Sequence, residues 1–182
     1  MEKSQTDLRL RYGAVKTRRQ FLHRAAALGG VAALADRLPR AVGGAVSGAN
    51  ARLGVGFIGV GGRGSGHVGV VQGLIGAGEP VAIVAVNDAY GPRMRAAAEK
   101  TGAKAYRTHH ELLADPAVDI VCVATPDRLH VPQSLDAIRA GKDVYCEKPM
   151  GHWTQFALSK EFYQETRRLD RIVQVGNQGN SS

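Results

Sequence analysis

The stretch LGVGFIGVGGRG, residues 53–64, decides the fold. Its first eight residues, 53–60, form an apolar run that predicts a short β-strand. The strand passes directly into glycines that fit the pattern G-x-G-x-x-G, in residues 59–64. A strand that ends in this pattern and opens a helix is typical of the βα turn that holds a dinucleotide. The stretch therefore predicts a doubly wound α/β fold.

Each glycine of the pattern has a separate physical task. Gly59 permits the tight turn, and Gly61 lacks a Cβ, so the backbone can approach a pyrophosphate. Gly64 lets the helix and the strand pack closely. The free N–H groups at the start of the helix then attract the phosphates. The candidate residues for binding a dinucleotide here are Gly59, Gly61, Gly62, Arg63 and Gly64.

Strands and helices alternate through the rest of the chain, from residue 51 to residue 182. Alternation implies right-handed crossovers and a parallel sheet that is covered on both faces. We therefore predict one Rossmann domain over 51–182, with strand order 3-2-1-4-5-6 and its ligand at the carboxyl ends of the strands. The predicted strands are 53–60, 80–88, 103–107, 118–126, 142–149 and 171–178, and the predicted helices are 65–75, 92–102, 109–115, 131–141 and 154–169.

An acidic residue ends the second predicted strand. Asp88 lies 24 residues beyond Gly64, close to the offset of about 20 residues expected for the acid that binds the adenosine ribose. A carboxylate at this place repels a 2′-phosphate, so NAD is favoured over NADP. Asn87 could share the role. Arg93 is nearby but beyond Pro92, and is a minor argument for NADP.

The first 50 residues differ in character from the rest and predict an export signal with a linker. Residues 1–20 are polar and basic, and the apolar run AAALGGVAALA, 25–35, is too short to span a bilayer. The pair Arg18-Arg19, followed by Phe21 and Leu22, resembles the twin-arginine (Tat) signal of bacteria. The segment AVSGANA, 45–51, offers several cleavage sites. We expect export by the Tat machinery to the periplasm.

Charge and cysteine usage exclude several other classes. The chain of 182 residues has a formal net charge of +8, but residues 1–49 hold nine Lys/Arg and three Asp/Glu, so they account for +6 of it. The remainder shows no basic stripe with aromatics, so we expect no nucleic-acid partner. Cys122 and Cys146 lie in apolar runs and are predicted to be buried free thiols. His109, His110 and His152 lack partners at ligand spacing along the chain, so no metal site is predicted.

The ends of the fourth and fifth strands carry a family resemblance. The segments ATPDRLH, 124–130, and EKPM, 147–150, resemble the paired signatures of the Gfo/Idh/MocA oxidoreductases, the family of glucose–fructose oxidoreductase and inositol dehydrogenase. GFIGVGGRG and VQVGNQ are similar to segments of exported, Tat-bearing members. The resemblance covers 53–178.

The resemblance implies roles for five residues. Thr125, Pro126 and His130 would line the nicotinamide side of the groove, and Glu147 and Lys148 would lie beside the nicotinamide ribose and the reacting carbon. Lys148 is the catalytic candidate, because an ammonium can donate a hydrogen bond to a carbonyl and an amine can take a proton from an alcohol. Glu147 could orient it. The implied substrate is a hydroxyl of a sugar or cyclitol.

Members of that family continue into a second α/β domain that shapes the sugar site and carries a histidine proton relay. This sequence ends at Ser182, so we expect the substrate domain to be absent and the chain alone to bind NAD without turnover. Two other functions stay open: an NAD-dependent glycosidase on the same scaffold, and a non-catalytic nucleotide-binding module. A homo-oligomer also stays open.

Overall fold

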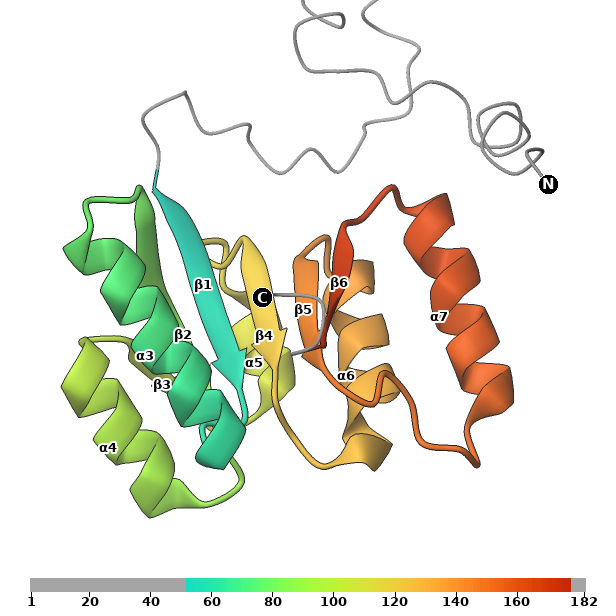
Figure 1. The fold of residues 1–182 in the computed structure, drawn as a ribbon, viewed down its shortest axis with the longest axis horizontal. Helices are drawn as coiled ribbons and strands as arrows, with labels where there is room; N and C mark the ends of the chain where they lie inside the picture. Colours follow the sequence, from blue (N-terminus) through green and yellow to red (C-terminus); the bar gives the residue numbers. More distant parts are fainter. Residues whose placement is uncertain (1–51, 178–182) are drawn as a thin grey trace, which may run out of the picture. The chain divides into compact units, whose positions relative to one another are not determined.

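The computed structural model describes residues 52–177, and the predicted leader lies outside the described residues. Six parallel strands form one sheet in the order β3-β2-β1-β4-β5-β6 (Figure 1). This order confirms the predicted doubly wound fold. The elements are β1 (Leu53–Ile58), α3 (Gly62–Gly76), β2 (Val81–Asn87), α4 (Gly91–Thr101), β3 (Lys104–Tyr106), α5 (His109–Ala114), β4 (Ile120–Val123), α6 (Asp127–Arg139), β5 (Asp143–Glu147), α7 (Phe156–Arg168) and β6 (Val173–Gly176).

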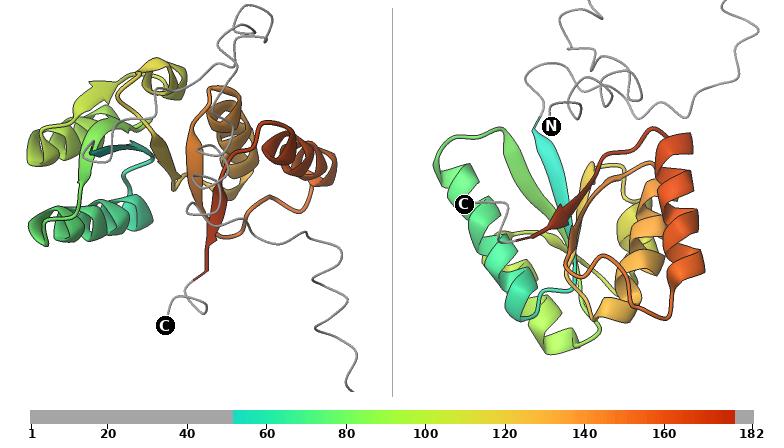
Figure 2. Two further views of the ribbon diagram at one scale, coloured as in Figure 1. Left: turned by 90° about the horizontal axis from the view of Figure 1, so that it is seen from above. Right: turned by 45° about the vertical axis from the view of Figure 1, so that its right-hand side comes forward.

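Helices cover both faces of the sheet, and each face has its own apolar core. Phe57 of β1 packs with residues of α3 and α4, whereas its neighbour Ile58 packs with residues of α5, α6 and α7. Successive side chains of a strand point to opposite faces, so a strand in the middle of three layers must be apolar throughout. Helices α6 and α7 lie side by side on the second face (Figure 2). The apolar strand runs of the sequence follow from this burial.

The two cysteines lie in this interior. Cys122 and Cys146 are both buried and free, as predicted. Burial raises the pKa of the Cys122 thiol to about 12 and that of Cys146 to about 11. Both side chains are therefore protonated, inert core residues at neutral pH. Among residues 52–177, no helix is both long and apolar enough to cross a membrane.

Helix α6 begins at Asp127, four residues before the start predicted from the sequence. The prediction placed Pro132 near the helix start, because proline cannot donate the backbone bond that an interior position requires. In the structure Pro132 lies inside the helix. The carbonyl four residues earlier, that of Arg128, instead accepts a hydrogen bond of 3.1 Å from Nε2 of Gln155. This side chain replaces the missing backbone donor.

The turn after β1 brings strand and helix into close contact. Gly59 has a φ of +85°, a left-handed conformation that glycine adopts without strain. A Cβ on Gly64, in the first turn of α3, would lie 2.0 Å from the carbonyl oxygen of Gly59. The oxygen belongs to the backbone of the turn, so it cannot move aside as a side chain would. The roles assigned to these two glycines from the sequence agree with this geometry.

Gly64→Ala is expected to destabilise the domain by about 1–3 kcal/mol, because the added methyl group overpacks the contact with Gly59. Gly69→Ala is the matched control, since a Cβ at Gly69 meets nothing within 4 Å. That change should be neutral or stabilise by up to about 1 kcal/mol through helix propensity. Urea unfolding of both variants measures the difference. Equal stabilities would show that the contact does not constrain the fold.

Candidate functional site

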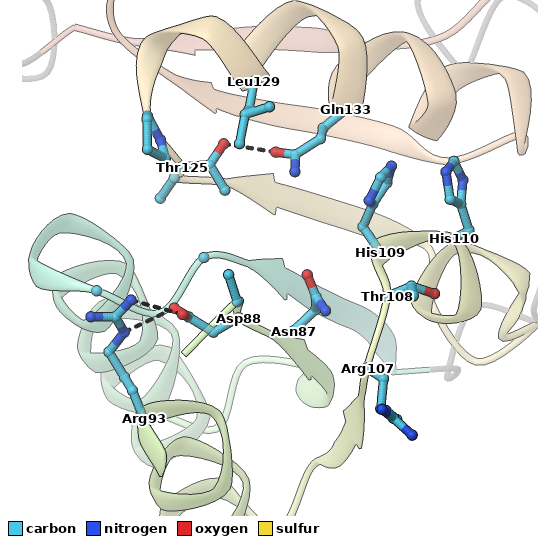
Figure 3. Close-up of a pocket in the computed structure, with 15 residues that line it drawn as sticks. Asn87, Asp88, Arg93, Arg107, Thr108, His109, His110, Thr125, Leu129 and Gln133 are labelled. Carbon is cyan, nitrogen blue, oxygen red and sulfur yellow. Dashed lines mark hydrogen bonds and ion pairs between the residues drawn. The ribbon is translucent and has the colours of Figure 1, made fainter. Parts of the chain in front are cut away.

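A cavity of about 640 Å³ opens at the carboxyl ends of the central strands. It lies between β1 and β4, where the strand order changes direction. Open α/β sheets bind their ligands at this topological switch point. Figure 3 shows its walls. The lining residues are Gly59, Gly61, Asn87, Asp88, Ala89, Arg93, Arg107, Thr108, His109, His110, Ala124, Thr125, Pro126, Leu129 and Gln133.

The start of α3 is left open for an anion. Its N-cap residue is Gly61, no side chain caps it, and its first turn holds no acidic residue. Helix α5 is different: Thr108 and Glu111 form a capping box that satisfies its first N–H groups. Unsatisfied N–H groups and the helix dipole make the start of α3 a site for phosphate oxygens. Gly62, Arg63 and Gly64 lie in this first turn.

The carboxylate of Asp88 is saturated with hydrogen bonds. Oδ1 accepts from the backbone N–H of Tyr90 at 2.8 Å and from Nη2 of Arg93 at 2.7 Å. Oδ2 accepts from the backbone N–H of Val60 at 2.9 Å and from Nε of Arg93 at 2.9 Å. Burial alone would raise the pKa of Asp88, but these hydrogen bonds and the guanidinium charge lower it. Asp88 is thus an ionised anchor between β2 and the glycine turn.

A second buried carboxylate, Glu147, ends β5 and faces the start of α3. Its Oε1 accepts hydrogen bonds from Nε and Nη2 of Arg63, at 3.2 and 2.8 Å, and lies 2.7 Å from Nε2 of His67. Oε2 accepts from the backbone N–H of Lys148 at 3.2 Å. Burial acts to raise the pKa of Glu147, and the contacts with Arg63, His67 and Lys148 lower it overall. Glu147 therefore ties β5 to the helix that carries the glycine pattern.

Three more of the predicted site residues lie around this edge of the sheet. Thr125 donates a hydrogen bond of 2.7 Å from Oγ1 to Oε1 of Gln133, inside the cavity (Figure 3). Pro126 lines the same wall. Lys148 is exposed and precedes Pro149 through a cis peptide bond. Neither Glu147 nor Lys148 lines the cavity itself; Glu147 is the last residue of β5, and Lys148 directly follows it.

His130 lies between the turns that follow β4 and β5. The resemblance puts it on the wall of the groove, but its side chain is only 1% exposed and does not line the cavity. Nδ1 lies 2.7 Å from the carbonyl oxygen of Pro149, and Nε2 lies 2.7 Å from that of Thr125. The imidazole thus bridges the turns after β4 and β5. Its position is that of a support for both turns.

Comparisons with known proteins agree with this geometry. Residues 53–177 match the GFO_IDH_MocA model, described as an oxidoreductase family with an NAD-binding Rossmann fold. The chain belongs to the Gfo/Idh/MocA family. It is 37% identical to inositol 2-dehydrogenase 2 of Saccharopolyspora erythraea over 125 residues, which cover 68% of this chain and 36% of the relative. The chain therefore spans about a third of the length of such relatives.

Two solved structures of similar fold are informative. The NAD-binding oxidoreductase of Klebsiella pneumoniae is 32% identical, with a TM-score of 0.60, over 69% of this chain and 34% of that one. The WlbA dehydrogenase of Chromobacterium violaceum, solved in complex with NADH and UDP-GlcNAcA, is 26% identical, with a TM-score of 0.66. This match covers 73% of the present chain and 37% of WlbA. Both are similar to the Gfo/Idh/MocA domain described above.

Sequence reasoning missed one residue of the Glu147 cluster. His67 lies four residues after Arg63 on α3, so both side chains share a helix face. This spacing was the available signal, but only the fold brings Glu147, 80 residues away, within 2.7 Å of His67. The ring of Tyr145 packs edge-on against His67, with 5.1 Å between the ring centroids.

The histidine pair at the start of α5 also has a partner that the sequence does not suggest. Nε2 of His109 lies 3.0 Å from Oδ2 of Asp136 on α6. His109, His110 and Asp136 each place one possible metal-ligand atom within 4.8 Å of the others. Spacing along the chain did not suggest this group, because α6 supplies the third member. The contact between His109 and Asp136 ties α5 to α6 at the rim of the cavity.

Acidification is expected to weaken the domain partly through Glu147. The pKa of Glu147 is lower in the folded protein than its ordinary value of 4.5. Its ionised form therefore stabilises the fold fully above pH 4.5, and this contribution is lost as the pH falls through the pKa of the folded state. Glu147→Gln should therefore reduce stability near neutral pH and flatten the loss of stability that sets in as the pH falls below about 4.5. Urea unfolding at several pH values tests this. Glu99→Gln, on the exposed face of α4, is the control and should keep the slope of the parent.

Proposed function

We propose that this chain is the NAD-binding part of an oxidoreductase that acts on a hydroxyl group of a sugar or cyclitol. The observation that carries the proposal is the cavity at the carboxyl ends of β1, β2 and β4, where the glycine turn, the uncapped start of α3 and Asp88 meet. Family membership supports it, as do a relative named inositol 2-dehydrogenase 2 and a neighbour solved with NADH and a nucleotide sugar.

The positions of Asp88 and the glycine turn suggest one orientation for the bound dinucleotide. Its adenosine ribose belongs at the end of β2, beside Asp88, and its pyrophosphate over Gly61 and the start of α3. Thr125 and the residues at the end of β5 would then hold the nicotinamide. When bound, NAD supplies the hydride acceptor of the reaction. The polypeptide supplies binding, orientation and a group that handles the proton.

Lys148 is the group we propose for the proton. It is exposed at the end of β5, and its backbone N–H is fixed by the carboxylate of Glu147. As an amine, the side chain can take the proton of a substrate hydroxyl; as an ammonium, it can donate a hydrogen bond to the carbonyl formed. The buried His130 supports the turns on either side, after β4 and β5.

A polyol or sugar is the proposed substrate, and a homo-oligomer remains a proposed assembly.

Two alternatives use the same cavity. An NAD-dependent glycosidase would oxidise its substrate only transiently, and a nucleotide-binding module would perform no chemistry. Incubating the purified chain with NAD and a panel of polyols, sugars and glycosides distinguishes the two chemistries: net formation of NADH indicates an oxidoreductase, and glycoside cleavage without it indicates a glycosidase. Binding alone is expected of a nucleotide-binding module and also of the NAD-binding part of a longer enzyme. Net NADH formation that is lost in Lys148→Ala supports the oxidoreductase.

NAD binding itself is the first requirement. We expect NADH to bind with its fluorescence changed, and Asp88→Ala to weaken binding by about 1.5–3 kcal/mol, because a charge-assisted hydrogen bond to the ribose is lost. Fluorescence titration measures both affinities. Asp127→Ala, an exposed acid in the first turn of α6, is the control and should bind like the parent. A parent chain that binds no NADH would refute the proposal.

We also propose that residues 1–50 direct export by the Tat machinery to the periplasm, as the pair Arg18-Arg19 before a short apolar run suggests. The Tat pathway, which the leader resembles, exports folded proteins. An enzyme could therefore acquire its dinucleotide in the cytoplasm and be exported with the dinucleotide bound. This accounts for an export signal and a dinucleotide fold in one chain.

Replacing both arginines by lysine, Arg18→Lys with Arg19→Lys, is expected to abolish export while the domain still folds. The double variant keeps the charge of the leader, so only recognition of the arginine pair is removed. Immunoblots of periplasmic and cytoplasmic fractions measure the outcome. The control is Arg9→Lys with Arg11→Lys, which changes two arginines outside the motif. Normal export of the Arg18/Arg19 variant would exclude the Tat assignment.

A further inference from the structure

Arg93 holds both oxygens of the carboxylate that the proposed cofactor needs. A carboxylate offers about four lone-pair sites, and in Asp88 four donors fill them: two backbone N–H groups and two nitrogens of Arg93. The Asp88 side chain is 3% exposed and that of Arg93 is 47% exposed. Both side chains line the cavity, and Figure 3 shows the guanidinium of Arg93 beside the carboxylate of Asp88.

The four donors differ in how easily they can leave. The N–H groups of Val60 and Tyr90 belong to the turns after β1 and β2, so they stay in place. Arg93 reaches Asp88 from α4 by a long, half-exposed side chain with several rotatable bonds. A ribose diol that is to hydrogen-bond Asp88 must take over the acceptor sites that Arg93 occupies. Arg93 is thus the exchangeable partner, and NAD has to compete with it.

Arg93 also lies where a 2′-substituent of the ribose would come. Its guanidinium carbon is 3.7 Å from the point at which a Cβ on Gly61 would stand, so it flanks the second glycine of the pattern. The same group lies 5.6 Å from the centroid of the exposed Tyr90 ring, in a cation–π contact. Tyr90 thus offers the guanidinium a second contact near the ribose site when it leaves Asp88.

We propose that Arg93 sets the cofactor preference of this site, by competing with the ribose hydroxyls for Asp88 and by offsetting the repulsion between Asp88 and a 2′-phosphate. Both effects act in one direction: Arg93 weakens NAD binding and strengthens NADP binding. A guanidinium can also receive a phosphate through two parallel hydrogen bonds. Asp88 alone would discriminate strongly against NADP, and the pair discriminates less.

The inference rests on the proposed binding of a dinucleotide in this cavity. The experiment measures dissociation constants of NADH and NADPH by fluorescence titration for the parent, Arg93→Gln and Arg95→Gln. The control residue Arg95 is exposed on the same helix, and its change removes the same charge. Arg93→Gln should bind NADPH at least about tenfold more weakly and NADH about two- to threefold more tightly. Arg95→Gln should match the parent.

A second pair of variants tests the competition separately. In an Asp88→Asn background the amide no longer pairs with the guanidinium as a carboxylate does, so Arg93→Gln should leave NADH affinity unchanged. Circular dichroism and urea unfolding establish that each variant is folded. A NADPH-to-NADH preference that is unchanged in Arg93→Gln, or equal losses of both affinities, would overturn the role of Arg93. Failure of the parent to bind either nucleotide would instead overturn the proposed function.

Discussion

The close contact between Gly64 and the carbonyl oxygen of Gly59 is the constraint on which the site depends. It fixes how near α3 can approach the end of β1, because a Cβ would lie 2.0 Å from that oxygen. The approach points the open start of the helix at the carboxyl edge of the sheet. It also carries Arg63 and His67 to within reach of β5. The glycine turn thus positions both the uncapped start of α3 and the side chains that connect this helix to β5.

Two buried carboxylates connect the glycine turn and α3 to the ends of other strands. Asp88 connects β2 with the backbone at Val60, and Glu147 connects β5 with α3. Burying a carboxylate is costly unless its oxygens are hydrogen-bonded, and here each oxygen has at least one donor. Leaving either charge without its arginine would leave a buried ion uncompensated. The two pairs therefore hold the strand ends in register around the cavity.

The sequence predicts the framework better than the contacts within it. Two-sided burial requires continuous apolar strands, so all six strands could be located, and a parallel α/β sheet has few allowed topologies. The early start of α6 was missed because a side chain, Gln155, replaces the backbone bond that Pro132 removes. The motif that contains His130 gives its position in the chain but not its contacts with the carbonyl groups of Thr125 and Pro149. Arg63 and Glu147 are 84 residues apart, and only the completed fold makes them partners.

The distribution of charge explains how a nearly neutral domain can offer an anion site. Most of the excess positive charge belongs to residues 1–49, and the two arginines at the glycine turn, Arg63 and Arg93, are paired with carboxylates. These two guanidinium groups, already neutralised by carboxylates, therefore contribute little to the attraction of a pyrophosphate. The uncapped N–H groups of α3 supply it instead, from a fixed direction. Backbone donors hold phosphates without distinguishing between dinucleotides, so discrimination falls to side chains at the ends of β2 and β5. The same fold can thus keep its glycine turn and uncapped helix start while its cofactor and substrate preferences change.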